Sequence, residues 1–167
     1  MPEVIVGLPI FAIAAFLQVS VLTKIRLLNG AVNLVMVCLI VWSINSSTKY
    51  SWIMAVWSGL LMTYVSAMPL YGYMLLNLGV WGFIRFIKKR VWQMPMILTL
   101  FVTIVSTLVE ALFTMGLLTV QNANLDYLLS LNQVIVPSLI MNLLFTIPVY
   151  AFLNDVINTI YINEVAE

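Results

Sequence analysis

The sequence predicts an all-α membrane protein, a polytopic helical bundle with about six transmembrane helices. Two observations support this fold class: 63% of the 167 residues are hydrophobic, and only 8% are charged. Soluble domains contain about 25% charged residues, so a soluble fold of this size would leave much apolar surface in water. The length suits one integral membrane domain, residues 1–167, and the net charge of +1 gives no reason to expect nucleic acid as a partner.

Charged residues divide the chain, because they rarely lie within hydrocarbon. The charge-free segment Val4–Thr23 fits one pass of about 20 residues. A cleavable signal peptide is the competing interpretation, but Glu3 stands where such a peptide has a basic start. A short second pass is predicted from about Ala31 to Ile44, closed by the polar turn Asn45–Lys49.

The segment Tyr50–Ile84 is too long for one pass. As a single helix it would extend about 50 Å, against a hydrocarbon core of about 30 Å. Pro69 lies near its middle and disfavours helix at the preceding residue. We therefore predict two short helices, Trp52–Ala67 and Tyr71–Ile87, with a re-entrant hairpin as the alternative.

The last two passes are predicted at Pro95–Leu118 and Val134–Leu153, and the tail Asn154–Glu167 is expected to lie on the membrane surface. Four basic residues end the fourth helix and are expected to anchor it among lipid headgroups: Arg85, Lys88, Lys89 and Arg90. With six passes, five of the seven basic residues share a side with both termini, which are then cytoplasmic. With five passes, six basic residues would lie on one side of the membrane and one on the other, which the charge rule prefers. Helix length and Pro69 favour six passes.

The sequence offers few groups for chemistry. It has no histidine, which removes the commonest general base and the commonest transition-metal ligand. Its single cysteine, Cys38, lies in an apolar stretch and is expected to be a small buried side chain. Since no phosphate loop, nucleophile elbow or metal-ligand cluster occurs, we predict no enzyme, no catalytic residue, no cofactor and no metal site.

Glu110 is the only ionisable residue deep within a predicted helix. A carboxylate at the bilayer centre costs about 2.5–3.5 kcal/mol, so it needs partners or stays protonated. Hydroxyl residues lie on or beside the same helical face, and amides on other helices are further candidates for this polar site: Thr99, Thr103, Ser106, Thr107, Thr114, Asn77, Asn142, Thr146 and Gln18. Interhelical hydrogen bonding is the preferred interpretation, and a proton or ligand site the alternative.

Two segments resemble the MreD family of bacterial rod shape-determining proteins. The first, Gly59–Leu70, reads GLLMTYVSAMPL, where the family tends to show Gly-Leu-Leu-x-Asp, then Ser-Gly, then Pro-Leu-Gly. The matching positions are Gly59, Ser66, Pro69 and, one residue late, Gly72; Thr63 stands where the family often has Asp, and Ala67 where it often has Gly. The second, Val136–Tyr150, is similar to the family's closing helix in Pro137 and Asn142. Gly72, Gly79 and Gly82 are expected to let other backbones approach.

The resemblance implies a non-catalytic subunit of the rod-elongation complex in the bacterial cytoplasmic (inner) membrane. It implies association with MreC and, through it, with MreB, RodA and a class B penicillin-binding protein during lateral peptidoglycan synthesis. The family is similar in fold to the S components of energy-coupling-factor transporters, so a substrate-binding subunit of a vitamin transporter is the alternative. The Ala-x-x-x-Ala docking pattern of S components is missing, since Ala12, Ala14 and Ala15 lack that spacing. A proton-coupled carrier centred on Glu110 is the third hypothesis.

Overall fold

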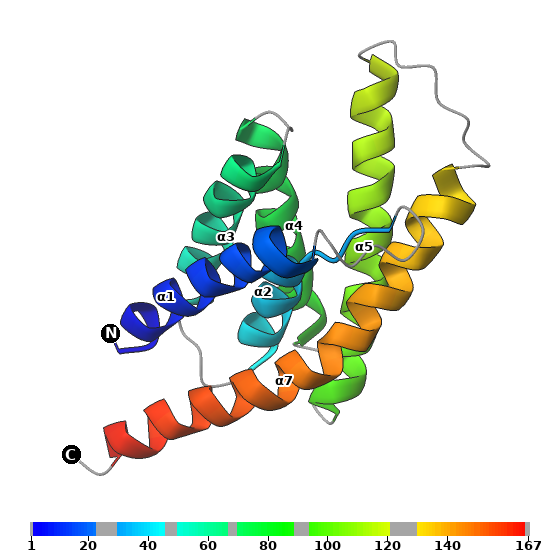
Figure 1. Cartoon of the computed structure of the whole chain (residues 1–167). Coiled ribbons are helices and arrows are strands. Elements are labelled where there is room, and N and C mark those ends of the chain that lie inside the picture. The colour runs from blue at the N-terminus through cyan, green and yellow to red at the C-terminus, as the bar shows by residue number, and fades with distance from the viewer. Residues whose placement is uncertain are drawn as a thin grey trace.

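The computed structural model describes residues 2–22, 30–45, 50–66, 70–88, 94–120 and 130–165, and every regular element within them is helical (Figure 1). The predicted all-α class is therefore confirmed. The elements in chain order are α1 (Pro2–Leu17), a π-helical turn (Gln18–Leu22), α2 (Leu34–Ile44), α3 (Ser51–Val65), α4 (Leu70–Lys88), α5 (Pro95–Val120), a second π-helical turn (Leu131–Ile135) and α7 (Val136–Val165).

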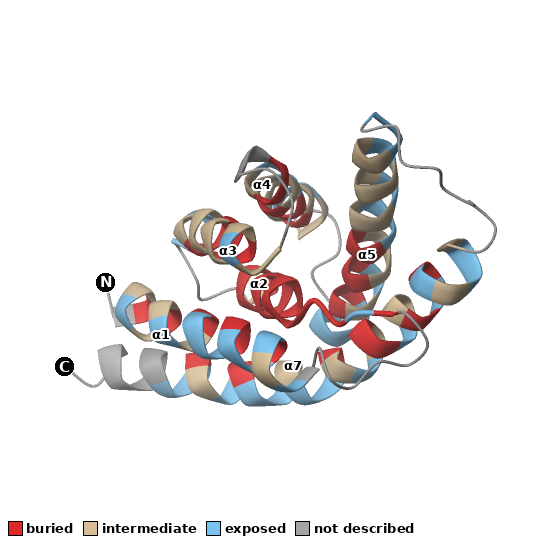
Figure 2. Ribbon diagram, turned by 45° about the horizontal axis from the view of Figure 1, so that its top comes forward, coloured by how far each residue is buried: buried red, intermediate tan, exposed pale blue. Residues whose placement is uncertain are grey.

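The short helix α2 forms the centre of the bundle. All 11 of its residues are buried, and α1, α3, α4, α5 and α7 all pack against it. Figure 2 shows this helix enclosed by the others. Its sequence, LVMVCLIVWSI, is apolar on every side, the pattern of a helix with no solvent-facing stripe. The helix begins at Leu34, so the predicted start at Ala31 is wrong, and residues 30–33 are not helical.

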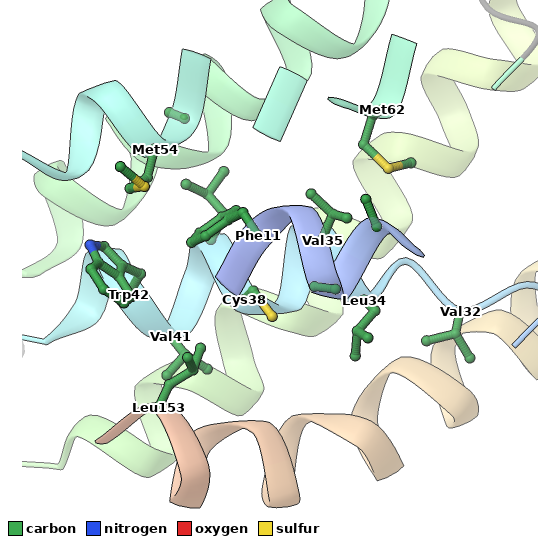
Figure 3. Packing of buried hydrophobic residues seen from close by; sticks show 14 of the residues in the cluster. Phe11, Val32, Leu34, Val35, Cys38, Val41, Trp42, Met54, Met62 and Leu153 are labelled. Atoms are coloured by element: carbon green, nitrogen blue, oxygen red, sulfur yellow. The ribbon is translucent and has the colours of Figure 1, made fainter. Parts of the chain in front are cut away.

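The main apolar cluster joins α2 to α1, α3 and α7 (Figure 3). The Trp42 ring of α2 meets Phe11 of α1 edge-on, with centroids 6.1 Å apart, an arrangement that aromatic pairs favour. Leu153 and Ile157 of α7 are buried in the same cluster. The helix α7 continues past Leu153, where the last pass was predicted to end, and Ile157 still packs in the core.

The segment Tyr50–Ile84 forms two helices, α3 and α4, as its length predicted, and these pack side by side (Figure 1). Their backbones touch at Gly59, where an added Cβ would lie 2.8 Å from the Cα of Met74. Pro69, between the two helices, lies outside the described residues. Gly72 is buried.

Two other glycines of α4 play no such part. A Cβ added at Gly79 or Gly82 would meet nothing within 4 Å, so the expectation that they admit another backbone is wrong. The sequence alone does not show that Gly59 contacts another backbone and that Gly79 and Gly82 do not.

Three helical stretches are long and apolar enough to cross a membrane: Glu3–Val21, Pro95–Val120 and Leu131–Thr159. By this measure the chain is a helical membrane protein. The central helix α2 is different, because its 11 residues rise only about 16 Å, roughly half of a hydrocarbon core of about 30 Å. The chain therefore enters the middle of the bundle through the non-helical segment 30–33.

Hydrogen bonds gather several helix ends at one end of the bundle, here named the Lys88 end. The Lys88 Nζ donates to the carbonyl oxygens of Asn45 at 2.8 Å and Ser43 at 3.3 Å, both at the end of α2. Asn45 in turn donates through Nδ2 to Asn154 Oδ1 of α7 at 3.3 Å. The backbone N–H of Tyr50, before α3, donates to Glu3 Oε1 of α1 at 3.1 Å.

Candidate functional site

A cavity of about 500 Å³ lies at the end of the bundle opposite the Lys88 end, beyond the start of α2. Its walls come from both π-helical turns, the non-helical segment 30–33, the end of α3, the start of α4, the second half of α5 and the start of α7. Polar lining residues include Gln18, Asn33, Tyr73, Glu110 and Asn142. Side chains from almost every part of the chain thus meet at the start of the central helix.

The N-terminus of α2 is capped by side chains. The first N–H groups of a helix lack partners within it, and buried ones must find them elsewhere. Asn33 is the N-cap residue, and its Oδ1 accepts from the backbone N–H of Met36 at 3.0 Å. The Oε1 of Gln18, from the π-helical turn after α1, accepts from the N–H of Val35 at 3.2 Å.

The start of α7 holds the non-helical segment 30–33 in place. Asn142 Oδ1 accepts from the backbone N–H of Asn33 at 2.8 Å, and Ser138 Oγ accepts from that of Ala31 at 3.0 Å. A Cβ on Gly30 would lie 2.7 Å from Pro137 Cβ and 2.8 Å from the Ser138 nitrogen, so only glycine fits this approach. Within a bilayer, non-helical backbone is tolerated only where protein or a water-filled cavity satisfies its hydrogen bonds. Ser138 and Asn142 accept such bonds from the segment 30–33.

Glu110 finds its partners in two residues that the sequence analysis did not single out. Its Oε1 accepts from Asn33 Nδ2 at 2.7 Å, and the Tyr73 hydroxyl lies within hydrogen-bonding reach of its carboxyl group. Asn33 did carry a signal, since an asparagine directly before an apolar run is a helix N-cap pattern. The predicted start at Ala31 instead placed Asn33 inside the helix. No sequence pattern distinguished Tyr73.

The threonine hydroxyls of α5 do not donate to the carboxyl group of Glu110, contrary to expectation. The side chains of Thr103, Ser106 and Thr107 are buried and that of Thr114 is half-buried, yet each threonine donates to the carbonyl four residues back in its own helix. Their oxygens still accept bonds from α7: Thr107 from Asn142 Nδ2 at 3.1 Å, and Thr103 from the Thr146 hydroxyl at 3.3 Å. This face therefore joins α5 to α7, with the Ser106 Oγ buried and unpartnered among the described residues.

Asn77 lies elsewhere. Its Nδ2 donates to Ser58 Oγ at 2.9 Å, which links α4 to α3. Trp81 and Ser51 make a second link between the same helices, with Nε1 and Oγ 3.0 Å apart. These bonds are the interhelical kind that the sequence analysis preferred for membrane amides.

Two residues of the basic cluster, Lys88 and Arg85, make different contacts. Lys88 is half-buried, and its bonds to Ser43 and Asn45 place a cation at the C-terminus of α2, where the helix dipole favours it. Arg85 is exposed, and its guanidinium lies 5.4 Å from the ring centroid of Trp81, a cation–π contact. Lys89 and Arg90 lie outside the described residues.

The chemistry of the site is that of hydrogen bonding. Within the described ranges, no group of three His, Cys, Asp or Glu side chains is placed to hold a metal ion. The amides of Gln18, Asn33 and Asn142 are occupied in holding backbone. Glu110 is the one carboxylate that lines the cavity among its described residues.

Comparison with known proteins gives no match. No family model, no curated protein and no solved structure matches the chain.

Proposed function

We propose that the chain is a non-catalytic membrane subunit of the bacterial rod-elongation complex, similar to MreD. In this role it holds MreC and connects it with MreB, RodA and a class B penicillin-binding protein during lateral peptidoglycan synthesis. The supporting observation is that residues carrying the resemblance make the contacts that define this architecture. Asn142 holds the segment before α2, Pro137 packs on Gly30, and Gly59 lets α3 touch α4.

The state of the polar groups also supports a role without catalysis. General acids, bases and nucleophiles must reach a substrate atom within hydrogen-bonding distance. Here the amides around the cavity are bound to backbone, and the threonine hydroxyls of α5 donate within their own helix. Such groups stabilise a helix junction, which is the requirement of a scaffold that works through contacts.

Co-purification tests this proposal. Solubilised in mild detergent from a rod-shaped bacterium, the tagged chain is expected to bring down MreC, and RodA with its penicillin-binding protein. A tagged membrane protein of similar size and abundance serves as the control for non-specific capture. Recovery of none of these partners, from membranes that contain them all, would contradict the assembly role.

We propose six crossings of the cytoplasmic membrane with both termini in the cytoplasm. The support is the gathering of Glu3, Tyr50, Lys88 and Asn154 at the Lys88 end, which six alternating passes require. In a Cys38→Ser background, Ser66→Cys is expected to react with an impermeant thiol reagent from outside the cell. Arg85→Cys is expected to react only after the membrane is opened. Labelling of both positions from the same side would rule out the six-pass topology.

A substrate-binding subunit of a vitamin transporter is the second candidate, favoured by one observation. The cavity lies between the end of α1, the segment 30–33 and the start of α7, and its volume of about 500 Å³ would hold a small molecule. The same purification separates the two candidates. A pair of ATPases with a membrane coupling subunit, recovered in place of cell-wall synthases, would favour the transporter.

A further inference from the structure

We propose that the cavity binds a small organic cation, a primary or secondary amine with a compact apolar body, whose ammonium group pairs with Glu110. This inference does not depend on the proposed assembly role. It concerns the isolated chain, and a scaffold and a transporter subunit would each be able to carry such a site.

The charge of the cavity favours a cation. Glu110 supplies a carboxylate, and none of the lining residues that the structure describes is lysine or arginine. The described basic side chains, Arg85 and Lys88, lie at the opposite end of the bundle. A carboxylate away from bulk water is stabilised by an opposite charge with good hydrogen-bond geometry, so a ligand that brings that charge is favoured.

The hydrogen-bonding capacity of Glu110 points the same way. An ionised carboxylate has about four acceptor sites, and only Asn33 and Tyr73 approach this one among the described residues. About two acceptor sites are therefore left for a ligand. An ammonium group offers up to three donors and one positive charge, and so matches what the site lacks.

The remaining walls fit an apolar body. The cavity is lined on two sides by apolar side chains: Met62 and Val65 of α3, and Met115 and Leu118 of α5. Methionine side chains adapt to the shape of what they contact. The volume of about 500 Å³ lies within the range of about 300–1,000 Å³ seen for small-molecule sites, which are mostly apolar with a few convergent polar groups.

Binding of matched probes to the purified full chain tests the proposal. In nanodiscs of neutral phosphatidylcholine, phenethylamine is expected to bind saturably by isothermal titration calorimetry. Phenethyl alcohol, which keeps the ring but lacks the charge, is expected to bind at least about tenfold more weakly. Hydrocinnamate, which carries a negative charge, is expected not to bind.

Two variants make the assignment specific. Glu110→Gln keeps an acceptor for Asn33 and is expected to weaken phenethylamine at least about tenfold while leaving phenethyl alcohol unchanged. Asp155→Asn removes a carboxylate from the exposed side of α7 and is the matched control, expected to bind as the wild type does. Ala111→Phe fills the cavity without changing charge and is expected to abolish binding of both probes, whereas Ala151→Phe, on an exposed position, is not.

Two results would overturn the proposal. One is phenethylamine binding that is equally tight in Glu110→Gln. The other is failure of phenethylamine to bind a wild-type chain that circular dichroism shows to be folded, which would leave a basic side chain of a partner helix as the cation that Glu110 meets. The purification of the assembly is a separate measurement, so either proposal can fail while the other stands.

Discussion

Asn33→Ala is expected to lower the free energy of unfolding by about 2–4 kcal/mol. Loss of an N-cap side chain costs about 1 kcal/mol, and a buried carboxylate that loses a donor costs about 1–3 kcal/mol more. Both losses occur together here, because Oδ1 of Asn33 caps α2 and its Nδ2 binds Glu110. Unfolding of the detergent-solubilised protein in sodium dodecyl sulfate, followed by circular dichroism, measures the change.

A double-variant cycle separates the two contributions. Asn33→Asp keeps an acceptor for the Met36 N–H but sets a second carboxylate against Glu110, so it is expected to destabilise at least as much as Asn33→Ala. Glu110→Gln alone is expected to be tolerated, since its amide oxygen still accepts from Asn33. In the double variant Asn33→Asp/Glu110→Gln, the amide of residue 110 can donate to the carboxylate of residue 33. The coupling free energy between the two changes is expected to be about 1–3 kcal/mol.

Asn158→Ala, on the exposed side of α7, is the matched control and is expected to leave stability within about 0.5 kcal/mol of wild type. A double variant no more stable than Asn33→Asp would show that Asn33 and Glu110 do not interact. An Asn33→Ala protein as stable as wild type would show that α2 needs no cap at this position.

The long helices were predictable from the sequence because their signals are local. The division of Tyr50–Ile84 into α3 and α4 follows from a length limit and one proline. The start of α5 at Pro95 was predicted from the basic cluster before it in the sequence, because charged side chains rarely lie within hydrocarbon. The buried polar face of α5 follows from spacing alone, because residues three and four apart share a helical face.

The cavity was not predictable in the same way, because its contacts join distant parts of the chain. Asn33 and Glu110 are 77 residues apart, and Asn33 and Asn142 are 109 apart. Periodicity shows which face of a helix is polar but not which segment meets it. The expected partners of Glu110, Asn77 and Asn142, were chosen by residue type, and the structure instead binds them to Ser58 and to the backbone of Asn33.

The extent of α2 was mispredicted for a related reason. Apart from Asn33, the run from Ala31 to Ile44 contains no local signal that separates a helix from a non-helical segment held by other helices. Ala31 and Val32 are apolar, yet their segment is not helical, because Ser138 and Asn142 of α7 accept from the backbone N–H groups of Ala31 and Asn33. Tertiary contacts here override the preference for helix.

Gly59→Ala is expected to lower the free energy of unfolding by about 1–3 kcal/mol, the usual cost of forcing extra volume into a packed interior. The added Cβ would lie 2.8 Å from Met74 Cα and 3.2 Å from its nitrogen, and these backbone atoms cannot rotate away as a side chain would. The helices α3 and α4 must therefore separate. That separation also strains the bond between Asn77 and Ser58, the residue next to Gly59.

Gly79→Ala and Gly82→Ala make the same chemical change on the partner helix α4, where a Cβ meets nothing within 4 Å. Both are expected to stabilise the protein by about 0.5–1 kcal/mol, because alanine leaves the unfolded chain less freedom than glycine and fits a helix better. Thermal unfolding midpoints of the three variants in one detergent measure the contrast. A midpoint that falls for Gly59→Ala and rises for the other two variants would show that contact with α4, and not glycine's helix propensity, determines the residue at position 59. A midpoint for Gly59→Ala that rises with the other two would mean that the two backbones do not touch there.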